Sequence, residues 1–325
     1  MTAAIYHLDY LQAVVIGLLQ GISELFPISS LGHTVIIPSW IGGTWATLVR
    51  QEAQPESPYL AFVVGLHLAT AFVLLGFYIR EWTRLVVGFF TSFGHRRRLS
   101  DSERLAWLIV VATIPVGLLG LEFEHQFRVL FAKPLAASLF LMVNGVILAV
   151  GEARRRRLGA VVAATTGMEG TDPASGEGPA RRFRDDRIVT MDAGSERQLA
   201  HIGLPSAAII GASQALALLA GISREGVAMV GGLFRGLDNE NALRFSFLLS
   251  TPVILAAGAL KVPDLMGSLG QGVRAQVVAG SVAAVATSLF AVIFLTRWFR
   301  TRTLVPFAVY CLVFGLASTI RFGLF

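Results

Sequence analysis

The sequence predicts an all-α integral membrane protein with an inverted-topology repeat, each half being a re-entrant helical hairpin followed by three transmembrane helices. Of its 325 residues 54% are hydrophobic and only 15% are charged, whereas a soluble globular domain has about 25% charged residues. Six stretches without Asp, Glu, Lys or Arg are long enough to cross a bilayer. Two further apolar stretches are interrupted by polar and turn-forming residues. The single cysteine, Cys311, excludes a disulfide scaffold.

The first half is expected over residues 1–151. Its apolar stretch at the N-terminus is interrupted by Glu24, a proline and a Ser-Ser pair before apolar sequence resumes. Broken helices are tolerated in lipid only where protein or a water-filled cavity covers the freed backbone, so residues 11–42 are expected to form a re-entrant hairpin. A bilayer needs roughly 20 apolar residues per helix, and three spans are expected at 59–79, 105–121 and 134–151.

The second half, residues 199–325, repeats this pattern after a polar segment. Residues 152–198 have a Gly/Thr/Ala/Pro-rich middle, nine arginines and no hydrophobic period, which predicts a disordered linker. The apolar stretch that follows is broken by Arg224, Glu225 and glycines, so a second re-entrant hairpin is expected at 202–234. Three further spans are expected at 245–260, 275–296 and 303–320.

The basic residues predict how the chain is oriented. Twenty of the 27 Lys and Arg residues fall in the linker and in three loops on the same side of the predicted spans. The positive-inside rule makes that side cytoplasmic, so the first hairpin enters from outside and the second from inside. Inverted repeats of this kind place their site near the bilayer midplane. The net charge of +6 is thereby explained without a nucleic-acid partner.

A short internal match supports the repeat. Residues 18–24 and 218–224 are identical at five of seven positions. On this alignment Glu24 and Arg224 are equivalent positions with opposite charge.

Charged residues at membrane depth are expected to be functional, because an ionised side chain at a helix centre costs about 2.5–3.5 kcal/mol. Glu24 and Arg224 meet this description, and a purely structural ion pair is the competing interpretation. A carboxylate, hydroxyls, an imidazole and a guanidinium together suit phosphoryl transfer. The candidate site residues are Gln20, Glu24, Ser29, Ser30, His33, Ser223, Arg224, Glu225 and Gly226. His67, within a charge-free span, is expected to pack or to bond the backbone instead.

The first hairpin carries a family resemblance. Residues 18–33, LLQGISELFPISSLGH, resemble the signature of the undecaprenyl-diphosphate phosphatases, the bacitracin-resistance family. Residues 221–226, GISREG, resemble the second motif of that family, and 236–238 and 244–249 also fit. The resemblance covers the chain except for the linker.

The resemblance implies an enzyme of the bacterial plasma membrane that hydrolyses undecaprenyl diphosphate and recycles the lipid carrier of cell-wall synthesis. Its site would open to the extracytoplasmic side. Glu24 would be the essential carboxylate, as metal ligand or proton acceptor, and Arg224 would bind the diphosphate. Ser30 and His33 would be nucleophile and acid/base in either order. Gln20, Ser29, Ser223, Glu225 and Gly226 are assigned to substrate binding.

The resemblance also implies a divalent cation, Mg²⁺ or Ca²⁺, with Glu24 and Glu225 as candidate ligands. Ala220, Glu225 and Ala228 depart from the family motif, where proline, serine and threonine stand. Two alternative functions remain open: a divergent paralogue with weak hydrolysis, and a transporter or flippase of polyprenyl phosphate or another anionic amphiphile. For the assembly, a homodimer remains open. The expected partners are the polyprenyl diphosphate and membrane lipids.

Overall fold

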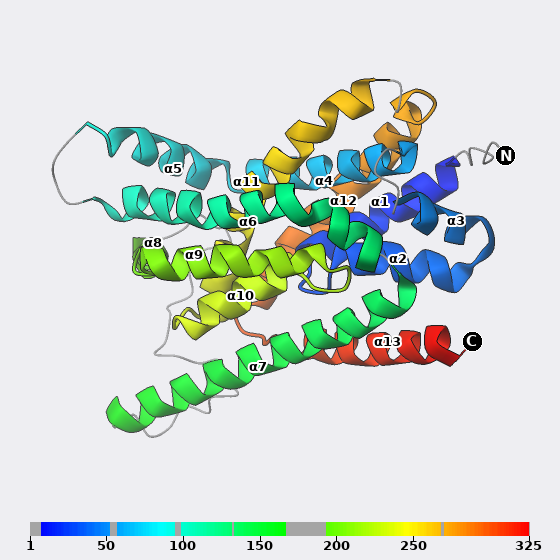
Figure 1. Ribbon diagram of the computed structural model, residues 1–325. Coiled ribbons are helices and arrows are strands. Elements are labelled where there is room, and N and C mark those ends of the chain that lie inside the picture. Colours follow the sequence, from blue (N-terminus) through cyan, green and yellow to red (C-terminus); the bar gives the residue numbers. More distant parts are fainter. Residues whose placement is uncertain are drawn as a thin grey trace.

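The computed structural model describes residues 8–52, 57–94, 99–131, 133–166, 193–267 and 270–324, and every regular element within them is a helix (Figure 1). The prediction of an all-α membrane protein is confirmed at this level. Six helices are long and apolar enough to cross a membrane, and each contains or closely matches one predicted span. They are α4 (Pro58–Phe77), α6 (Asp101–Phe131), α7 (Pro134–Thr166), α11 (Asn239–Met266), α12 (Arg274–Trp298) and α13 (Val305–Leu324).

Both predicted hairpin segments form two helical parts joined by a turn. In the first, α1 (Tyr10–Leu25) leads into α2 (Ser30–Ile41). In the second, α9 (Leu204–Ser213) continues as the short 3₁₀ helix η1 (Gln214–Leu218) before α10 (Arg224–Phe234).

The second helix of each hairpin begins in the same way. Ser29 is the N-cap of α2 and Ser223 is the N-cap of α10. Each serine Oγ accepts a hydrogen bond from the backbone N–H of a glycine three residues later, at 3.2 Å from Gly32 and 3.1 Å from Gly226. Such a cap satisfies a donor that the helix itself leaves unpaired.

This geometry corrects the register of the internal match. Residues 18–24 lie wholly within α1, whereas 218–224 contain the end of η1, a turn and the first residue of α10. Glu24 therefore precedes its turn, while Arg224 follows its own. Treating the two residues as equivalent positions is wrong, because identical letters fall on different parts of the two hairpins.

Helices of the first half pack against helices of the second half. α1 packs along α12 and α9 packs along α6, while α4 lies against α11 and α7 lies beside α13 (Figure 1). Small residues allow the backbones to approach, as is common between membrane helices. A Cβ at Gly17 would come within 2.2 Å of the Gly280 carbonyl oxygen, and one at Gly211 within 2.0 Å of the Ala112 carbonyl oxygen.

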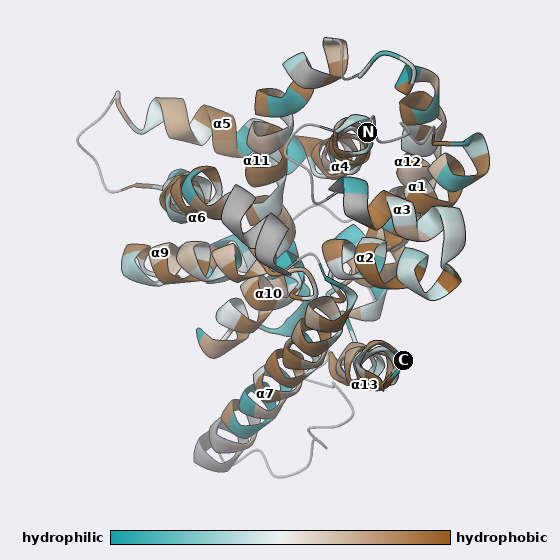
Figure 2. Ribbon diagram, turned by 45° about the vertical axis from the view of Figure 1, so that its right-hand side comes forward, coloured by the Kyte–Doolittle hydropathy of each residue, from teal (hydrophilic) through white to brown (hydrophobic). Residues whose placement is uncertain are grey.

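Both ends of the predicted linker are helical. α7 continues to Thr166, with Glu152 bound to Arg155 at 2.7 Å and to Arg156 at 3.0 Å, and pairs at these spacings support a helix. Figure 2 shows α7 becoming hydrophilic toward this end. Residues 193–200 form α8 (Ala193–Ala200). The middle of the linker, 167–192, lies outside the described residues.

Two further helices occupy segments that were expected to be loops. α3 (Gly43–Glu52) follows the first hairpin directly. α5 (Ile79–Thr91) lies in the first arginine-rich segment. Its apolar residues recur every three or four positions, the pattern of an amphipathic helix, and these are Trp82, Leu85, Val86, Phe89 and Phe90.

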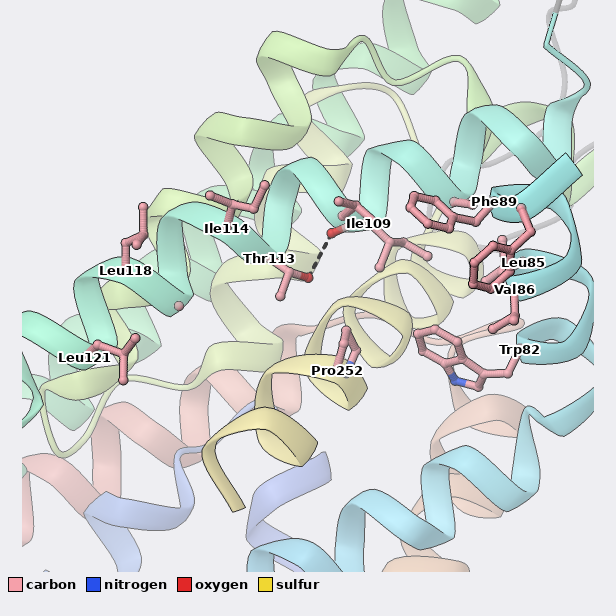
Figure 3. Close-up of a pocket in the computed structure, with 14 residues that line it drawn as sticks. Trp82, Leu85, Val86, Phe89, Ile109, Thr113, Ile114, Leu118, Leu121 and Pro252 are labelled. Carbon is pink, nitrogen blue, oxygen red and sulfur yellow. Dashed lines mark hydrogen bonds between the residues drawn. The ribbon is translucent and has the colours of Figure 1, made fainter. Parts of the chain in front are cut away.

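The apolar side of α5 faces α6 across a groove of about 530 Å³ (Figure 3). α6 lines the groove from Ala106 to Leu121, and α11 contributes Pro252 to its lining. Apart from the indole N–H of Trp82, the one polar side-chain group among its lining residues is the Thr113 hydroxyl, which already donates to the Ile109 carbonyl oxygen at 2.8 Å.

Candidate functional site

The turn of the first hairpin holds its residues in an unusual backbone conformation. α1 ends at Leu25 and Pro27 prevents its continuation. Ser29 has φ 73°, and it is the only non-glycine residue with positive φ in the described part of the chain. Its Oγ also accepts a hydrogen bond from the backbone N–H of Gly221, at 3.1 Å, in the turn of the other hairpin. Strained conformations of this kind persist where the surroundings fix them, commonly at functional sites.

Glu24 is the centre of a buried polar cluster beside this turn. The side chain is 4% exposed. Its Oε2 accepts a hydrogen bond from Gln20 Nε2 at 3.0 Å and another from the Ser30 hydroxyl. Gln20 lies one turn earlier on α1, and Ser30 is the first residue of α2. The predicted grouping of these three residues is therefore present in the structure.

His67 of α4 also contacts Glu24. Its Nε2 lies 3.3 Å from Glu24 Oε2, and its Nδ1 lies 2.9 Å from the Val63 carbonyl oxygen. The expected backbone bond is confirmed, and the ring also contacts the candidate site residue Glu24, which was not expected. Since both ring nitrogens face oxygens, this geometry requires a proton on both nitrogens or on the carboxyl group.

His33 is held away from this cluster. Its Nδ1 lies 2.7 Å from the Ser29 carbonyl oxygen and therefore donates. In the neutral ring its Nε2 accepts from the Tyr310 hydroxyl, also at 2.7 Å. The ring stacks against Tyr310 and Phe314 of α13. The structure thus brings Ser30 to Glu24 but directs His33 toward α13.

The turn of the second hairpin supplies the cationic side of the site. Arg224 is the first residue of α10, and its Nη1 is buried without a hydrogen-bond partner among the described residues. Its guanidinium lies within electrostatic range of the Glu24 carboxylate. A buried donor without a partner is costly, so this atom is a natural binding point for a ligand oxygen.

Glu225 follows at the N-terminus of α10. It is 3% exposed, and its Oε1 has no hydrogen-bond partner in the described part of the chain. The positive end of the helix macrodipole stabilises a carboxylate at this position, which is the purely structural interpretation. The carboxylate nevertheless lies within electrostatic range of both Glu24 and Arg224.

Asn144 of α7 joins the two turns. It is fully buried. Its Nδ2 donates to the Pro27 carbonyl oxygen at 2.9 Å, and its Oδ1 accepts from the Ser223 backbone N–H at 3.0 Å. The turns also meet directly, because a Cβ at Gly32 would lie 2.8 Å from the Gly221 Cα. Ser30 and Arg224 are each the first helical residue after a turn, so Asn144 fixes their relative position.

The oxygens at the site suit a hard divalent cation better than zinc. Among the described residues no group of three or more His, Cys, Asp and Glu side chains has metal-binding geometry. Mg²⁺, however, is commonly held by one or two carboxylates together with substrate phosphates. Gln20 Oε1 and Glu225 Oε1 are buried oxygens without partners within the described residues, and Glu24 adds a second carboxylate.

Three residues of this arrangement were not predicted from sequence as site residues: His67, Asn144 and Tyr310. His67 carried a signal, because it is an ionisable residue inside a charge-free span. Asn144 is likewise a strongly polar side chain within the predicted span 134–151. Tyr310 had no such signal, since tyrosine is common near the ends of membrane helices.

Comparison with known proteins gives consistent matches over almost the whole chain. The model of the family described as bacitracin resistance protein BacA matches residues 13–317. A protein of Mycolicibacterium paratuberculosis named undecaprenyl-diphosphatase is 51% identical, over 98% of this chain and 99% of its own. Undecaprenyl-diphosphatase 2 of Frankia alni is 50% identical over 98% and 99% of the two chains. The undecaprenyl-diphosphatase of Mycobacterium avium is 50% identical over 98% of each.

Proposed function

The chain belongs to the BacA family of bacitracin resistance proteins, and from this premise we propose that it is a membrane phosphatase that hydrolyses undecaprenyl diphosphate. The products are undecaprenyl phosphate and inorganic phosphate, and the reaction recycles the lipid carrier of cell-wall synthesis. The observation that carries the proposal is the meeting of two hairpin turns, one bearing Glu24 and Ser30 and the other bearing Arg224.

Ser30 and Glu24 form the reacting pair. The Ser30 hydroxyl donates to Glu24 Oε2, which is the arrangement of a nucleophile and its base. The Ser30 oxygen attacks the terminal phosphorus while its proton passes to Glu24. The bond from that phosphorus to the bridging oxygen breaks, and undecaprenyl phosphate leaves. Water then attacks the phosphoserine phosphorus and the bond to the Ser30 oxygen breaks. That oxygen takes the proton back from Glu24, which restores the Ser30 hydroxyl and the Glu24 carboxylate, and inorganic phosphate leaves.

The neighbouring residues bind the diphosphate and orient the reacting groups. Arg224 Nη1, buried and without a partner among the described residues, binds the diphosphate oxygens, since a guanidinium fits phosphate geometry. Gln20 and His67 hold Glu24 Oε2 from two sides at 3.0 Å and 3.3 Å. Because both ring nitrogens of His33 are engaged, we assign that histidine to fixing the first turn of α2. Ser29, Ser223 and Gly226 shape the two turns.

Gln20, Glu24 and Glu225 would hold a divalent cation, Mg²⁺ or Ca²⁺. The support is two buried oxygens without partners among the described residues, on Gln20 and Glu225. When bound, the cation neutralises part of the charge of the diphosphate. Glu225 would then add a second carboxylate to that of Glu24, because Gln20 offers only an uncharged amide oxygen. The test is the cation dependence of phosphate release in Glu225→Ser.

We also propose that the halves are inverted repeats, with the site open to the extracytoplasmic side and the linker in the cytoplasm. Two observations support the repeat. α2 and α10 have the same serine cap, and the first helix of each hairpin packs on a helix of the other half, α1 on α12 and α9 on α6. The distribution of the arginines supports the sidedness.

The same architecture favours a second candidate function, transport of polyprenyl phosphate, because inverted repeats are widespread in transporters. The buried Ser30–Glu24 contact favours hydrolysis, since binding and carrying an anion require no nucleophile.

One experiment separates these functions. Purified wild-type protein is expected to release phosphate from undecaprenyl diphosphate, and Glu24→Ala or Arg224→Ala should abolish release in protein that remains folded. Full activity in both variants would refute the site. Movement of lipid across proteoliposomes without phosphate release would establish the transporter instead.

A further inference from the structure

A second groove, of about 470 Å³, lies at the end of α12 and is chemically different from the apolar groove of Figure 3. It combines aromatic rings with guanidinium groups. Its lining residues are Phe290, Ile293, Phe294, Arg297, Trp298, Thr301 and Arg302.

The aromatic wall follows one face of α12. Phe290 and Phe294 stack with ring centroids 5.9 Å apart, and Phe294 stacks on Trp298 at 5.5 Å. Residues four apart are neighbours on a helix surface, so the three rings form a continuous apolar strip. The strip continues inward, since Phe294 also stacks at 5.7 Å on Phe26, in the turn after Glu24.

The guanidinium groups of Arg297 and Arg302 are exposed at the end of this strip. Within the described residues no carboxylate lies within ion-pair distance of Arg297 or Arg302, and the Arg302 guanidinium lies 6.0 Å from the Trp298 ring centroid. The neighbouring Arg300 differs, because it faces Glu240 at 4.0 Å. Two exposed cations beside an apolar strip complement a ligand that has an anionic end and a hydrocarbon end.

The position of the groove identifies the ligand class. It lies at one end of a helix long and apolar enough to cross a membrane. Tryptophan at such an end marks the membrane–water interface, where arginines attract anionic lipid headgroups. We propose that this groove binds an anionic phospholipid, with its phosphate between Arg297 and Arg302 and an acyl chain along Phe290 and Phe294. The inference is independent of the proposed enzymatic activity.

Phosphatidylglycerol and phosphatidylcholine serve as probes for the purified full chain. Titration followed by native mass spectrometry should show tighter binding of phosphatidylglycerol. Arg297→Gln and Arg302→Gln should each weaken that binding about fivefold, the effect of one charge near a membrane surface. Arg300→Gln is the matched control: it removes the same charge nearby, and binding should change less than about twofold.

Fluorescence then locates the bound lipid. Phosphatidylglycerol with brominated acyl chains should quench the tryptophan emission of the wild type more than that of Trp298→Phe. Equal weakening by Arg300→Gln, equal binding of phosphatidylcholine, or equal quenching in Trp298→Phe would each overturn the proposal.

Discussion

Asn144 offers the sharpest test of how the two hairpin turns are held together. Its side chain amide bonds the Pro27 carbonyl at 2.9 Å and the Ser223 N–H at 3.0 Å. Asn144→Leu roughly preserves the side-chain size but removes both bonds. It leaves two backbone groups buried without partners, each at a cost of about 1–3 kcal/mol. The expected loss of folding free energy is therefore about 2–6 kcal/mol.

Asn144→Leu should lose more activity than its loss of folding stability explains. Ser30 and Arg224 each begin a helix directly after one of the two turns, so a shift between the turns separates the nucleophile from the diphosphate-binding group. A displacement of about 1 Å can cost roughly 100-fold in rate. Phosphate release by folded Asn144→Leu should fall by about that factor.

The assay combines unfolding in detergent with phosphate release from undecaprenyl diphosphate, measured on the same preparation. Ser138→Ala is the matched control on α7, because Ser138 is also fully buried but its hydroxyl bonds the Pro134 carbonyl of its own helix at 2.6 Å. It should lose about 1 kcal/mol of stability and keep its activity within about twofold. A stable Asn144→Leu protein with the wild-type rate would show that Asn144 does not hold the two turns in place.

Three further predictions concern the site and its support. His67→Gln retains a donor toward Glu24 and should keep phosphate release within about tenfold of the wild type. His67→Leu should lose about 10–100-fold, the value of a hydrogen bond to a charged group. Equal losses in the two variants would contradict a positioning role for His67. Gly17→Ala places a Cβ 2.2 Å from a backbone oxygen of α12 and should lower stability in thermal unfolding by about 1–3 kcal/mol, while Gly76→Ala, with nothing within 4 Å, should not. Glu225→Ser should raise the Mg²⁺ or Ca²⁺ concentration for half-maximal phosphate release about tenfold; an unchanged concentration would exclude Glu225 as a ligand.

The membrane helices could be predicted because their signal is local. A charge-free stretch of about 20 residues has few alternatives to a spanning helix, and the six predicted spans all lie on such helices. The hairpin turns were equally visible, because Pro27 and the glycines around Arg224 interrupt apolar sequence. α5 was missed because the arginines of its polar face were used only for orientation.

The site could be predicted only in part, because contacts across the fold leave no pattern along the chain. Gln20, Glu24 and Ser30 are close in sequence, and their grouping was predicted. His67 reaches Glu24 from 43 positions away on α4, and nothing local reveals that approach. The internal match was aligned on five identical residues, whereas in the structure Ser29 and Ser223 are the residues with the same N-cap role. Only the backbone geometry reveals that correspondence.

If the two hairpin turns form a single catalytic site, Glu24 and Arg224 should act together, and a double-mutant cycle measures that coupling. Phosphate release from undecaprenyl diphosphate would be measured for Glu24→Asp, Arg224→Lys and the double variant. Conservative changes keep the rates measurable, and groups that act together show non-additive effects. We expect each single variant to lose at least about tenfold and the double variant to lose far less than the product of the two. Losses that multiply, or single variants with wild-type rates, would contradict a shared site.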